Sequence, residues 1–294
     1  MITLRYNRKS RNNDNIGLSP YTRRITTEDR VKRLDDLNGY NLKAALSAGT
    51  LCLQRYSKAI NALNVFPVPD GDTGTNMLLT MRSVEERLRA VDSKSISTVA
   101  QEAAHGALLG ARGNSGVIFS QFLTGFAKAL NGTESCDPAT LAQALASGSE
   151  ASYMAVSQPV EGTMLTIMRE FSAAAKDQAS QDKPDVISLW TGALKGARVA
   201  LEQTTFLLPV LRDAGVVDSG GQSVVVIMEG FLCSFLGENI ERFEVELSSP
   251  TGNAAHSPPT VSEQFIQTTQ SERYGFCTEF IIDGTNVHLA DLRS

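Results

Sequence analysis

The stretch NVFPVPDGDTGTNM, residues 64–77, interrupts a helical pattern and holds two prolines, two glycines and two aspartates. Asp70 and Asp72 stand on either side of Gly71, and a second helical pattern begins directly afterwards. One interpretation is a turn in which Asp72 or Thr73 caps the following helix while Asp70 is solvated. The other is a metal site, because two carboxylates this close repel each other unless a cation lies between them. Oxygen ligands of this kind suit Mg²⁺, and the spacing alone leaves both interpretations open.

Apolar residues on both sides of this stretch recur at the spacing of an α-helix. Before it, one apolar stripe is formed by Leu42, Leu46, Leu53, Tyr56, Ile60 and Leu63. After it, similar patterns occupy residues 74–91, 97–110, 114–131, 138–157, 162–178, 185–203 and 219–237. The β-branched run SVVVIM (223–228) lies within the last pattern and is interpreted as part of a buried helix. Since the connections are short, which favours antiparallel neighbours, the sequence predicts an all-α bundle or barrel of about eight helices.

The chain of 294 residues divides by composition into four parts. Residues 1–37 are rich in Lys and Arg and lack apolar periodicity, so we expect a disordered basic arm. Residues 38–240 carry the helical patterns. Residues 241–271 are rich in Ser, Pro and Gly, and we expect a linker there. Residues 272–294 contain a strand-like run (276–282) and an Asp-Gly turn, and we expect them to begin a truncated middle domain.

Charge and cysteine content argue against several classes of function. The formal net charge of −5 disfavours a nucleic-acid or anionic-membrane partner, because both require a basic surface. No apolar run looks long enough to cross a bilayer, and no secretory signal opens the chain. The four cysteines are widely spaced without a CxxC pair, which is typical of buried thiols in a reducing compartment. We therefore expect a cytoplasmic protein without a membrane span.

Three further glycine-bearing loops precede helical patterns: GARGNSGVIFSQF (110–122), PVEGTM (159–164) and AGVVDSGGQS (214–223). Each loop by itself is consistent with an ordinary capped turn. In an antiparallel barrel, however, the second, fourth, sixth and eighth helices begin at the same end, so these loops and the acidic loop would meet at one rim. Carboxylates bind cations and helix N-termini bind anions, and together they suit a metal-bound polyphosphate. Because the sequence contains neither GxxxxGK[ST] nor the motifs of protein kinases, it predicts a nucleotide site of another design.

The segments NALNVFPVPDGDTGTNM, GALLGARGNSGVIFSQFLTGF, PVEGTMLTIMRE and LPVLRDAGVVDSGGQ together carry a specific resemblance. They resemble the nucleotide-binding, DhaL-like domain that dihydroxyacetone kinases share with bacterial fatty acid kinases, over residues 38–238. The proline-containing acidic loop and the segment ERYGFCTEF (272–280) are similar to the fatty acid kinase branch in particular. The resemblance implies an eight-helix antiparallel barrel that binds ATP or ADP and two Mg²⁺ ions at one end.

The resemblance also implies roles for individual residues. Asp70 and Asp72 match the aspartates that bind Mg²⁺ and support catalysis in this family. Dihydroxyacetone kinases have a third aspartate where this sequence has Asn64 and Val65, and Asn64 is the candidate third metal ligand. The expected nucleotide-binding residues are Thr73, Gly74, Asn76, Asn114, Ser115, Gly116, Gly162, Thr163, Asp218, Ser219 and Gly220.

Three functions are compatible with these observations. The first is a kinase domain that phosphorylates a fatty acid presented by a separate carrier protein. The carboxylate of the fatty acid is already ionised at neutral pH and needs no general base. This agrees with the position of His105, His256 and His288 outside the rim loops. The second is a dihydroxyacetone (glycerone) kinase-like ATP-binding subunit, and the third is a non-catalytic nucleotide-binding regulator. We further expect that the chain binds ATP but is a poor kinase by itself, with a homodimer as a possible assembly.

Overall fold

The computed structural model describes residues 33–245 and 247–248. The expectations for the basic arm before residue 33, for the linker after residue 248 and for residues 272–294 therefore lie outside the described residues.

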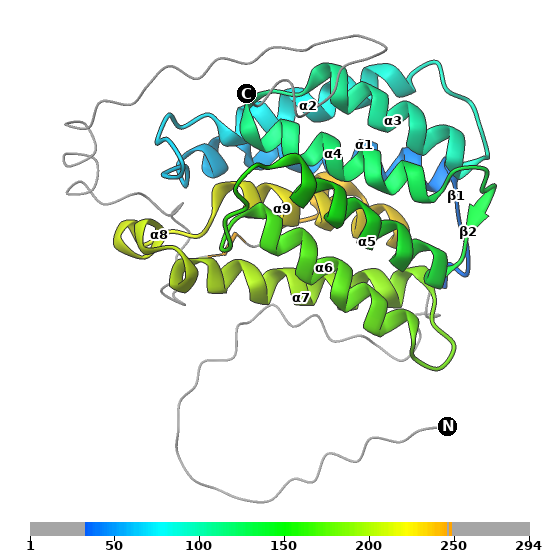
Figure 1. The fold of residues 1–294 in the computed structure, drawn as a ribbon. Coiled ribbons are helices and arrows are strands. Elements are labelled where there is room, and N and C mark those ends of the chain that lie inside the picture. Colours follow the sequence, from blue (N-terminus) through cyan, green and yellow to red (C-terminus); the bar gives the residue numbers. More distant parts are fainter. Residues whose placement is uncertain (1–32, 246, 249–294) are drawn as a thin grey trace, which may run out of the picture. The chain divides into compact units, whose positions relative to one another are not determined.

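The described chain is almost entirely helical, which confirms the predicted all-α class (Figure 1). Nine α-helices lie within the described residues: α1 Gly39–Asn61, α2 Thr73–Leu88, α3 Ile96–Gly110, α4 Gly113–Ala129, α5 Pro138–Ala155, α6 Met164–Ala179, α7 Val186–Leu207, α8 Pro209–Ala214 and α9 Ser219–Leu236. A 3₁₀ turn, η1, follows at Ile240–Arg242. Two strands of two residues each, β1 (Leu37–Asn38) and β2 (Ser135–Cys136), form an antiparallel pair. The short helix α8 lies in a connection where the sequence pattern predicts no helix.

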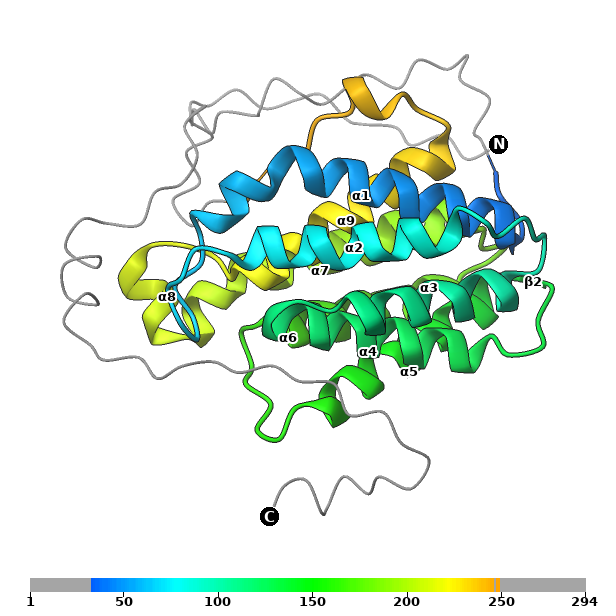
Figure 2. The ribbon, with the colours of Figure 1, turned by 90° about the horizontal axis from the view of Figure 1, so that it is seen from above.

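The eight long helices pack as a closed ring. Each long helix contacts the next one along the chain, and α9 packs against α1 to close the ring. Figure 2 shows these helices lying side by side with their connections at two opposite ends. This arrangement agrees with the expected antiparallel barrel, and it places the starts of α2, α4, α6 and α9 at one end.

Polar caps fix the starts of several helices at the opposite end. Asn38 and Asn41 form a reciprocal capping box at the start of α1. The carboxylate of Asp137 accepts the N–H of Thr140 at the start of α5, and Asp185 caps α7 in a second capping box. These side chains accept the first free N–H groups of each helix, so they explain why the helices begin there.

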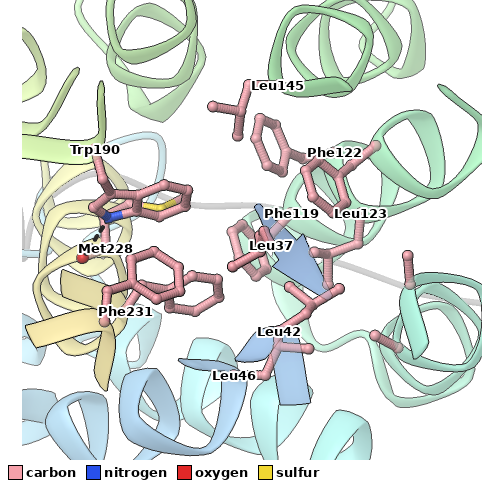
Figure 3. Close-up of a pocket in the computed structure, with 14 residues that line it drawn as sticks. Leu37, Leu42, Leu46, Phe119, Phe122, Leu123, Leu145, Trp190, Met228 and Phe231 are labelled. Carbon is pink, nitrogen blue, oxygen red and sulfur yellow. Dashed lines mark hydrogen bonds between the residues drawn. The ribbon is translucent and has the colours of Figure 1, made fainter. Parts of the chain in front are cut away.

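The interior of the ring is apolar and closely packed. Trp190 lies 5.0 Å from Phe171, 5.3 Å from Phe231 and 5.2 Å from Phe235 between ring centroids, and its Nε1 donates to the carbonyl of Met228 over 2.9 Å. Figure 3 shows this region and the apolar side chains around it. The free space there measures only about 20 Å³, and it is lined by residues such as Leu37, Phe119, Phe122, Leu145, Trp190 and Phe231. The interior therefore holds the helices together by packing.

Helix α9 is buried along most of its length, including the β-branched run 223–228. By length and composition it could cross a membrane, although the sequence suggested no such run, but 83% of its apolar window is buried inside the fold. Cys52, Cys136 and Cys233 are free and buried, as expected for these three cysteines. Helix α9 is thus a core helix of the ring.

The chain after α9 turns back along α1 and α9, and we call residues 239–245 and 247–248 the return segment. Arg55 donates to two of its carbonyl oxygens, Tyr56 Oη accepts one of its N–H groups, and Gln222 Oε1 accepts the N–H of Ser248. Its apolar side chains pack against the core. The return segment therefore packs against both α1 and α9, and Ser248 lies beside the first turn of α9.

Candidate functional site at the rim of the helical ring

The four glycine-bearing loops meet at one end of the ring, which we call the rim (Figure 2). Ser219 Oγ at the start of α9 donates to Thr73 Oγ1 at the start of α2 over 3.1 Å. At the start of α4, a Cβ added to Gly113 would lie 2.5 Å from Nδ2 of Asn76 in α2. A Cβ added to Gly220 would lie 3.3 Å from Met164 Cβ at the start of α6. These contacts connect the starts of α2, α4, α6 and α9.

The acidic loop presents its two carboxylates just before α2. Asp70 is exposed and Asp72 half-buried, and Gly71 between them has a φ of +69°, which a side chain would strain. Partial burial raises the pKa of Asp70 above its ordinary value, and the charge of Asp72 and a shared hydrogen bond raise it further. Two carboxyl groups that compete for a proton in this way are also suited to share a cation.

Asp72 stands at the N-cap position of α2, but its side chain makes no capping hydrogen bond. The capping oxygen comes instead from Asn61, whose Oδ1 accepts the N–H of Thr75, the third residue of α2, over 3.1 Å. Asn64 Oδ1 accepts the N–H of Asp72 and the N–H of Thr73, each over 3.2 Å. Of the two interpretations of this loop, simple capping by Asp72 is therefore not what the structure shows. The carboxylate of Asp72 is left free of the helix end.

Asn64 itself is fully engaged with the protein. Its Oδ1 also accepts the hydroxyl of Thr73 over 2.8 Å, and its Nδ2 donates to the carbonyl of Val68 over 2.9 Å. The side chain is buried, with 6% exposed. Because three protein donors already point at Oδ1, this geometry argues against the expectation that Asn64 is a third metal ligand.

The start of α4 differs from the other rim helices because no side chain caps it. Its N-cap residue, Arg112, makes no side-chain capping hydrogen bond, and the side chain is exposed. The N–H of Arg112 is held by Thr80 Oγ1 over 3.1 Å, which fixes the loop against α2. Asn114 is exposed and Ser115 half-buried in the first turn, followed by the buried Gly116. An uncapped N-terminus with a nearby guanidinium is a favourable place for an anion.

At the start of α6, the predicted binding residues have structural roles. Thr163 Oγ1 accepts the N–H of Leu165 over 3.4 Å and donates to the carbonyl of Val160 over 2.8 Å. Gly162 is buried with a φ of +83°, and its N–H is bound by Thr166 Oγ1. These bonds shape the turn, so a contact of Gly162 and Thr163 with a nucleotide stays a prediction.

At the start of α9, Asp218 acts as the cap. Its carboxylate accepts the N–H of Gly221 over 2.7 Å and is 4% exposed. Burial raises the pKa of Asp218 to about 6, although hydrogen bonds from the N–H groups of Gly221 and Met164 act in the opposite direction. Ser219 and Gly220 are buried beside it. The structure therefore brings this loop to the rim but gives it a capping role.

Two groups of rim residues were missed by the sequence analysis. Asn61 binds both the N–H and the hydroxyl of Thr75, beside Gly74, and so steadies the first turn of α2. The spacing of Asn61 and Asn64 at the end of the first helical pattern was the available signal. Asparagine at a helix end is common enough that this signal is weak without the tertiary structure.

The second group holds the loop between α5 and α6. Glu161 accepts hydrogen bonds from Tyr153 over 2.9 Å, from Arg169 over 2.6 Å and from Thr166 over 2.6 Å. Burial alone would raise the pKa of Glu161, but these hydrogen bonds and the charge of Arg169 outweigh it and lower the pKa. The four residues are spread over 17 positions of the sequence, from 153 to 169, so no local motif announces them.

The donor set at the rim fits a hard divalent cation that shares its ligands with a substrate. Within residues 33–245 and 247–248, no three His, Cys, Asp or Glu side chains are grouped so as to hold a metal ion. The pair Asp70 and Asp72 would therefore have to be completed by water or by phosphate oxygens. This is how Mg²⁺ is usually bound in nucleotide sites, since it keeps several waters and takes few protein carboxylates.

Several known proteins are similar to this chain in sequence. The family model for the DAK2 domain matches residues 67–233. Protein YloV of Bacillus subtilis (strain 168) is 39% identical over 247 residues, which cover 84% of this chain and 44% of the relative. An uncharacterized protein of Staphylococcus saprophyticus is 39% identical over 238 residues, which cover 80% of this chain and 42% of the relative. An uncharacterized protein of Staphylococcus aureus (strain MRSA252) is 37% identical over 249 residues, which cover 85% of this chain and 44% of the relative.

The chain thus spans less than half the length of these curated relatives. Its matched region runs from the acidic loop to the buried helix α9 and includes all four rim loops. The chain therefore belongs to the DAK2 domain family, a kinase-related family whose domains bind ADP or ATP.

Proposed function

We propose that the rim binds ATP together with Mg²⁺ and that the chain supplies the kinase domain for phosphorylation of a fatty acid held by a separate carrier protein. The observation that carries the proposal is the pairing of two unlike features at the rim. The close carboxylates of Asp70 and Asp72 lie before α2, and the uncapped N-terminus of α4 is joined to α2 through Asn76 and Thr80. Together they offer ligands for a cation and donors for an anion.

In this proposal each feature has a distinct role. Asp70 and Asp72 hold Mg²⁺, with two ions expected, and Mg²⁺ neutralises charge on the phosphates. The first N–H groups of α4 and the hydroxyl of Ser115 bind phosphate oxygens, and Asn114 lies beside them at the surface. Further contacts with the nucleotide are expected from Thr73, Gly74, Asn76, Gly116, Gly162, Thr163, Asp218, Ser219 and Gly220.

Phosphoryl transfer depends mainly on positioning and on charge neutralisation, and requires little covalent chemistry from the protein. A fatty acid carboxylate is ionised at neutral pH and attacks without a general base. His105, on the exposed side of α3, is not needed for the reaction. The acceptor and the carrier rest on the resemblance to the fatty acid kinase branch, while the family match supports a nucleotide-binding subunit more generally. The buried free thiols of Cys52, Cys136 and Cys233 are in keeping with a cytoplasmic location.

Calorimetric titration with ATP, with and without Mg²⁺, tests the nucleotide site. Phosphoryl transfer is then tested with a fatty acid on a purified carrier, by trapping acyl phosphate with hydroxylamine, and in parallel with dihydroxyacetone. We expect Mg²⁺-dependent ATP binding, with acyl phosphate formed when a carrier and a longer chain are supplied. Turnover of dihydroxyacetone instead would assign a glycerone kinase-like subunit. Binding without transfer to either acceptor under these conditions would indicate a regulator, and absence of ATP binding would contradict the proposal.

A further inference from the structure

We infer that Asn64 is a positioning residue for the two rim carboxylates. Its amide holds the acidic loop on both sides of Asp70 and binds the first N–H group of α2. The inference rests on the proposed role of Asp70 and Asp72 in binding Mg²⁺, and it assigns to Asn64 a function other than coordination of the metal.

The side chain of Asn64 spans the acidic loop. Asn64 Nδ2 donates to the carbonyl of Val68, before the aspartates, and Oδ1 accepts the N–H groups of Asp72 and Thr73, after them. One planar amide thus sets the separation between the two ends of the segment that carries Asp70. With only 6% of Asn64 exposed, water competes little for these bonds.

The start of α2 is capped without the side chain of Asp72. An aspartate at an N-cap position ordinarily turns its carboxylate toward the N–H groups of the next residues. Asp137, Asp185 and Asp218 all do so in this protein. Asp72 does not: Asn61 accepts the N–H of Thr75, the group that an N-cap side chain would bind, and Asn64 accepts the N–H of Thr73. The helix start is satisfied, and the carboxylate of Asp72 stays free to face a cation.

Hydrogen bonds through Thr73 connect Asn64 to the start of α9. Thr73 Oγ1 donates to Asn64 Oδ1 over 2.8 Å and accepts the hydroxyl of Ser219 over 3.1 Å. Thr73 and Ser219 are 8% and 3% exposed. The orientation of the Asn64 amide is therefore tied to the start of α9, and the acidic loop is held against the closed ring. An amide with three donors at its oxygen has no lone pair left for a cation.

Binding of Mn²⁺, followed by electron paramagnetic resonance on the full chain without nucleotide, separates positioning from coordination. We expect Asn64→Asp to weaken Mn²⁺ binding even though it adds a carboxylate, because it loses the donor to Val68 and places an acceptor against that carbonyl. Asn64→Ala should weaken binding by about 10- to 100-fold, as for other residues that orient metal ligands. Tighter binding by Asn64→Asp would overturn the inference and make Asn64 a ligand.

Asp137→Ala is the matched control, because Asp137 caps α5 at the opposite end of the ring and belongs to none of the rim loops. It should lower thermal stability and leave Mn²⁺ affinity nearly unchanged; an equal loss of affinity in both variants would contradict a specific role for Asn64. Asp72→Ala is the reference for the site. If Asp72→Ala binds Mn²⁺ as tightly as the parent protein, the proposed metal site is wrong. If Asp72→Ala loses Mn²⁺ binding but Asn64→Ala binds Mn²⁺ as tightly as the parent protein, only the inference about Asn64 fails.

Should Asn64→Asp fail to fold, as judged by circular dichroism, Asn64→Ser gives the same comparison. Its hydroxyl can still accept an N–H group of α2 but is too short to replace both arms of the amide. Weaker Mn²⁺ binding by folded Asn64→Ser is the expected result. Unchanged binding by this variant would overturn the inference.

Discussion

The hydroxyl of Ser219 donates a hydrogen bond to the hydroxyl of Thr73 over 3.1 Å, although 146 positions of the sequence separate the two residues. Both side chains are buried, and each lies in the first turn of its helix. The bond therefore joins the start of α2, next to the acidic loop, to the start of α9, which closes the ring against α1. Any change that opens the ring at α9 would also disturb the loop that carries Asp70 and Asp72.

We predict that Asp72→Ala abolishes the Mg²⁺ dependence of ATP binding while the fold survives. The Asp72 side chain makes no capping bond, so its loss should change the free energy of unfolding by less than about 0.5 kcal/mol. Calorimetry measures the ATP affinity of the variant, and urea denaturation measures its free energy of unfolding. The matched control is Asp137→Ala, which removes a true cap at the opposite end of the ring and should cost about 1 kcal/mol of stability without affecting ATP binding. Equal ATP affinity of parent and Asp72→Ala in Mg²⁺ would contradict the metal assignment.

Ser115→Ala should weaken ATP binding without changing the stability of the nucleotide-free protein. Ser115 does not cap α4 in the structure, so loss of its hydroxyl should appear only as a lost hydrogen bond to phosphate, on the order of 1 kcal/mol or about fivefold in affinity. Ser95→Ala, which removes the cap of α3, is the control and should show the reverse pattern. A lower melting temperature of nucleotide-free Ser115→Ala with unchanged ATP affinity would mean that the residue is structural.

The buried carboxyl of Asp218 should make stability depend on pH. Its folded-state pKa, about 6 because of burial, lies above the ordinary value of 3.8. The folded state therefore holds the proton more tightly than the unfolded state, and its stabilising contribution is complete below about pH 4 and is lost as the pH rises through about 6. Asp218→Asn keeps a capping oxygen but cannot ionise. Urea denaturation between pH 4 and 8 should show the parent losing stability relative to this variant as pH rises, and parallel curves would refute the assignment.

Tyr56→Phe should loosen the return segment. Tyr56 Oη accepts the N–H of the buried Val245 over 2.8 Å, and removing the acceptor should cost about 1 kcal/mol. Faster hydrogen exchange at Val245, with a small fall in melting temperature, is the expected observation. Tyr40→Phe is the control, because Tyr40 is exposed at the start of the same helix, and it should change neither quantity. Unaltered exchange at Val245 in Tyr56→Phe would show that packing alone holds the segment.

The positions of the long helices were predictable because helix formation leaves a local signature. The predicted patterns 97–110 and 219–237 differ by one residue or less at each end from the helices observed at Ile96–Gly110 and Ser219–Leu236. Apolar spacing of 3.6 residues and polar residues at the breaks suffice for this. The short helix α8 escaped detection because six residues are too few to establish a period.

The gathering of the rim loops also follows from the sequence, through the alternation of helices in an antiparallel ring. The role of each residue within those loops does not. Sequence alone treats Asp72 and Asp218 alike, as acidic residues before a helix, yet Asp218 caps α9 and Asp72 leaves the cap of α2 to Asn61. Which donor meets which acceptor depends on the path of the loop between them.

The sequence by itself thus determined the helical class, the approximate positions of the long helices, the family and the loops that carry the candidate site, because each is encoded in residues close together along the chain. Only the tertiary structure decided that Asn64 spans the acidic loop, that the start of α4 is left uncapped and that the return segment packs against α1. The physical reason is that a buried hydrogen bond requires its partners to be brought together by packing. Residues such as Thr73 and Ser219 become neighbours only when the ring closes.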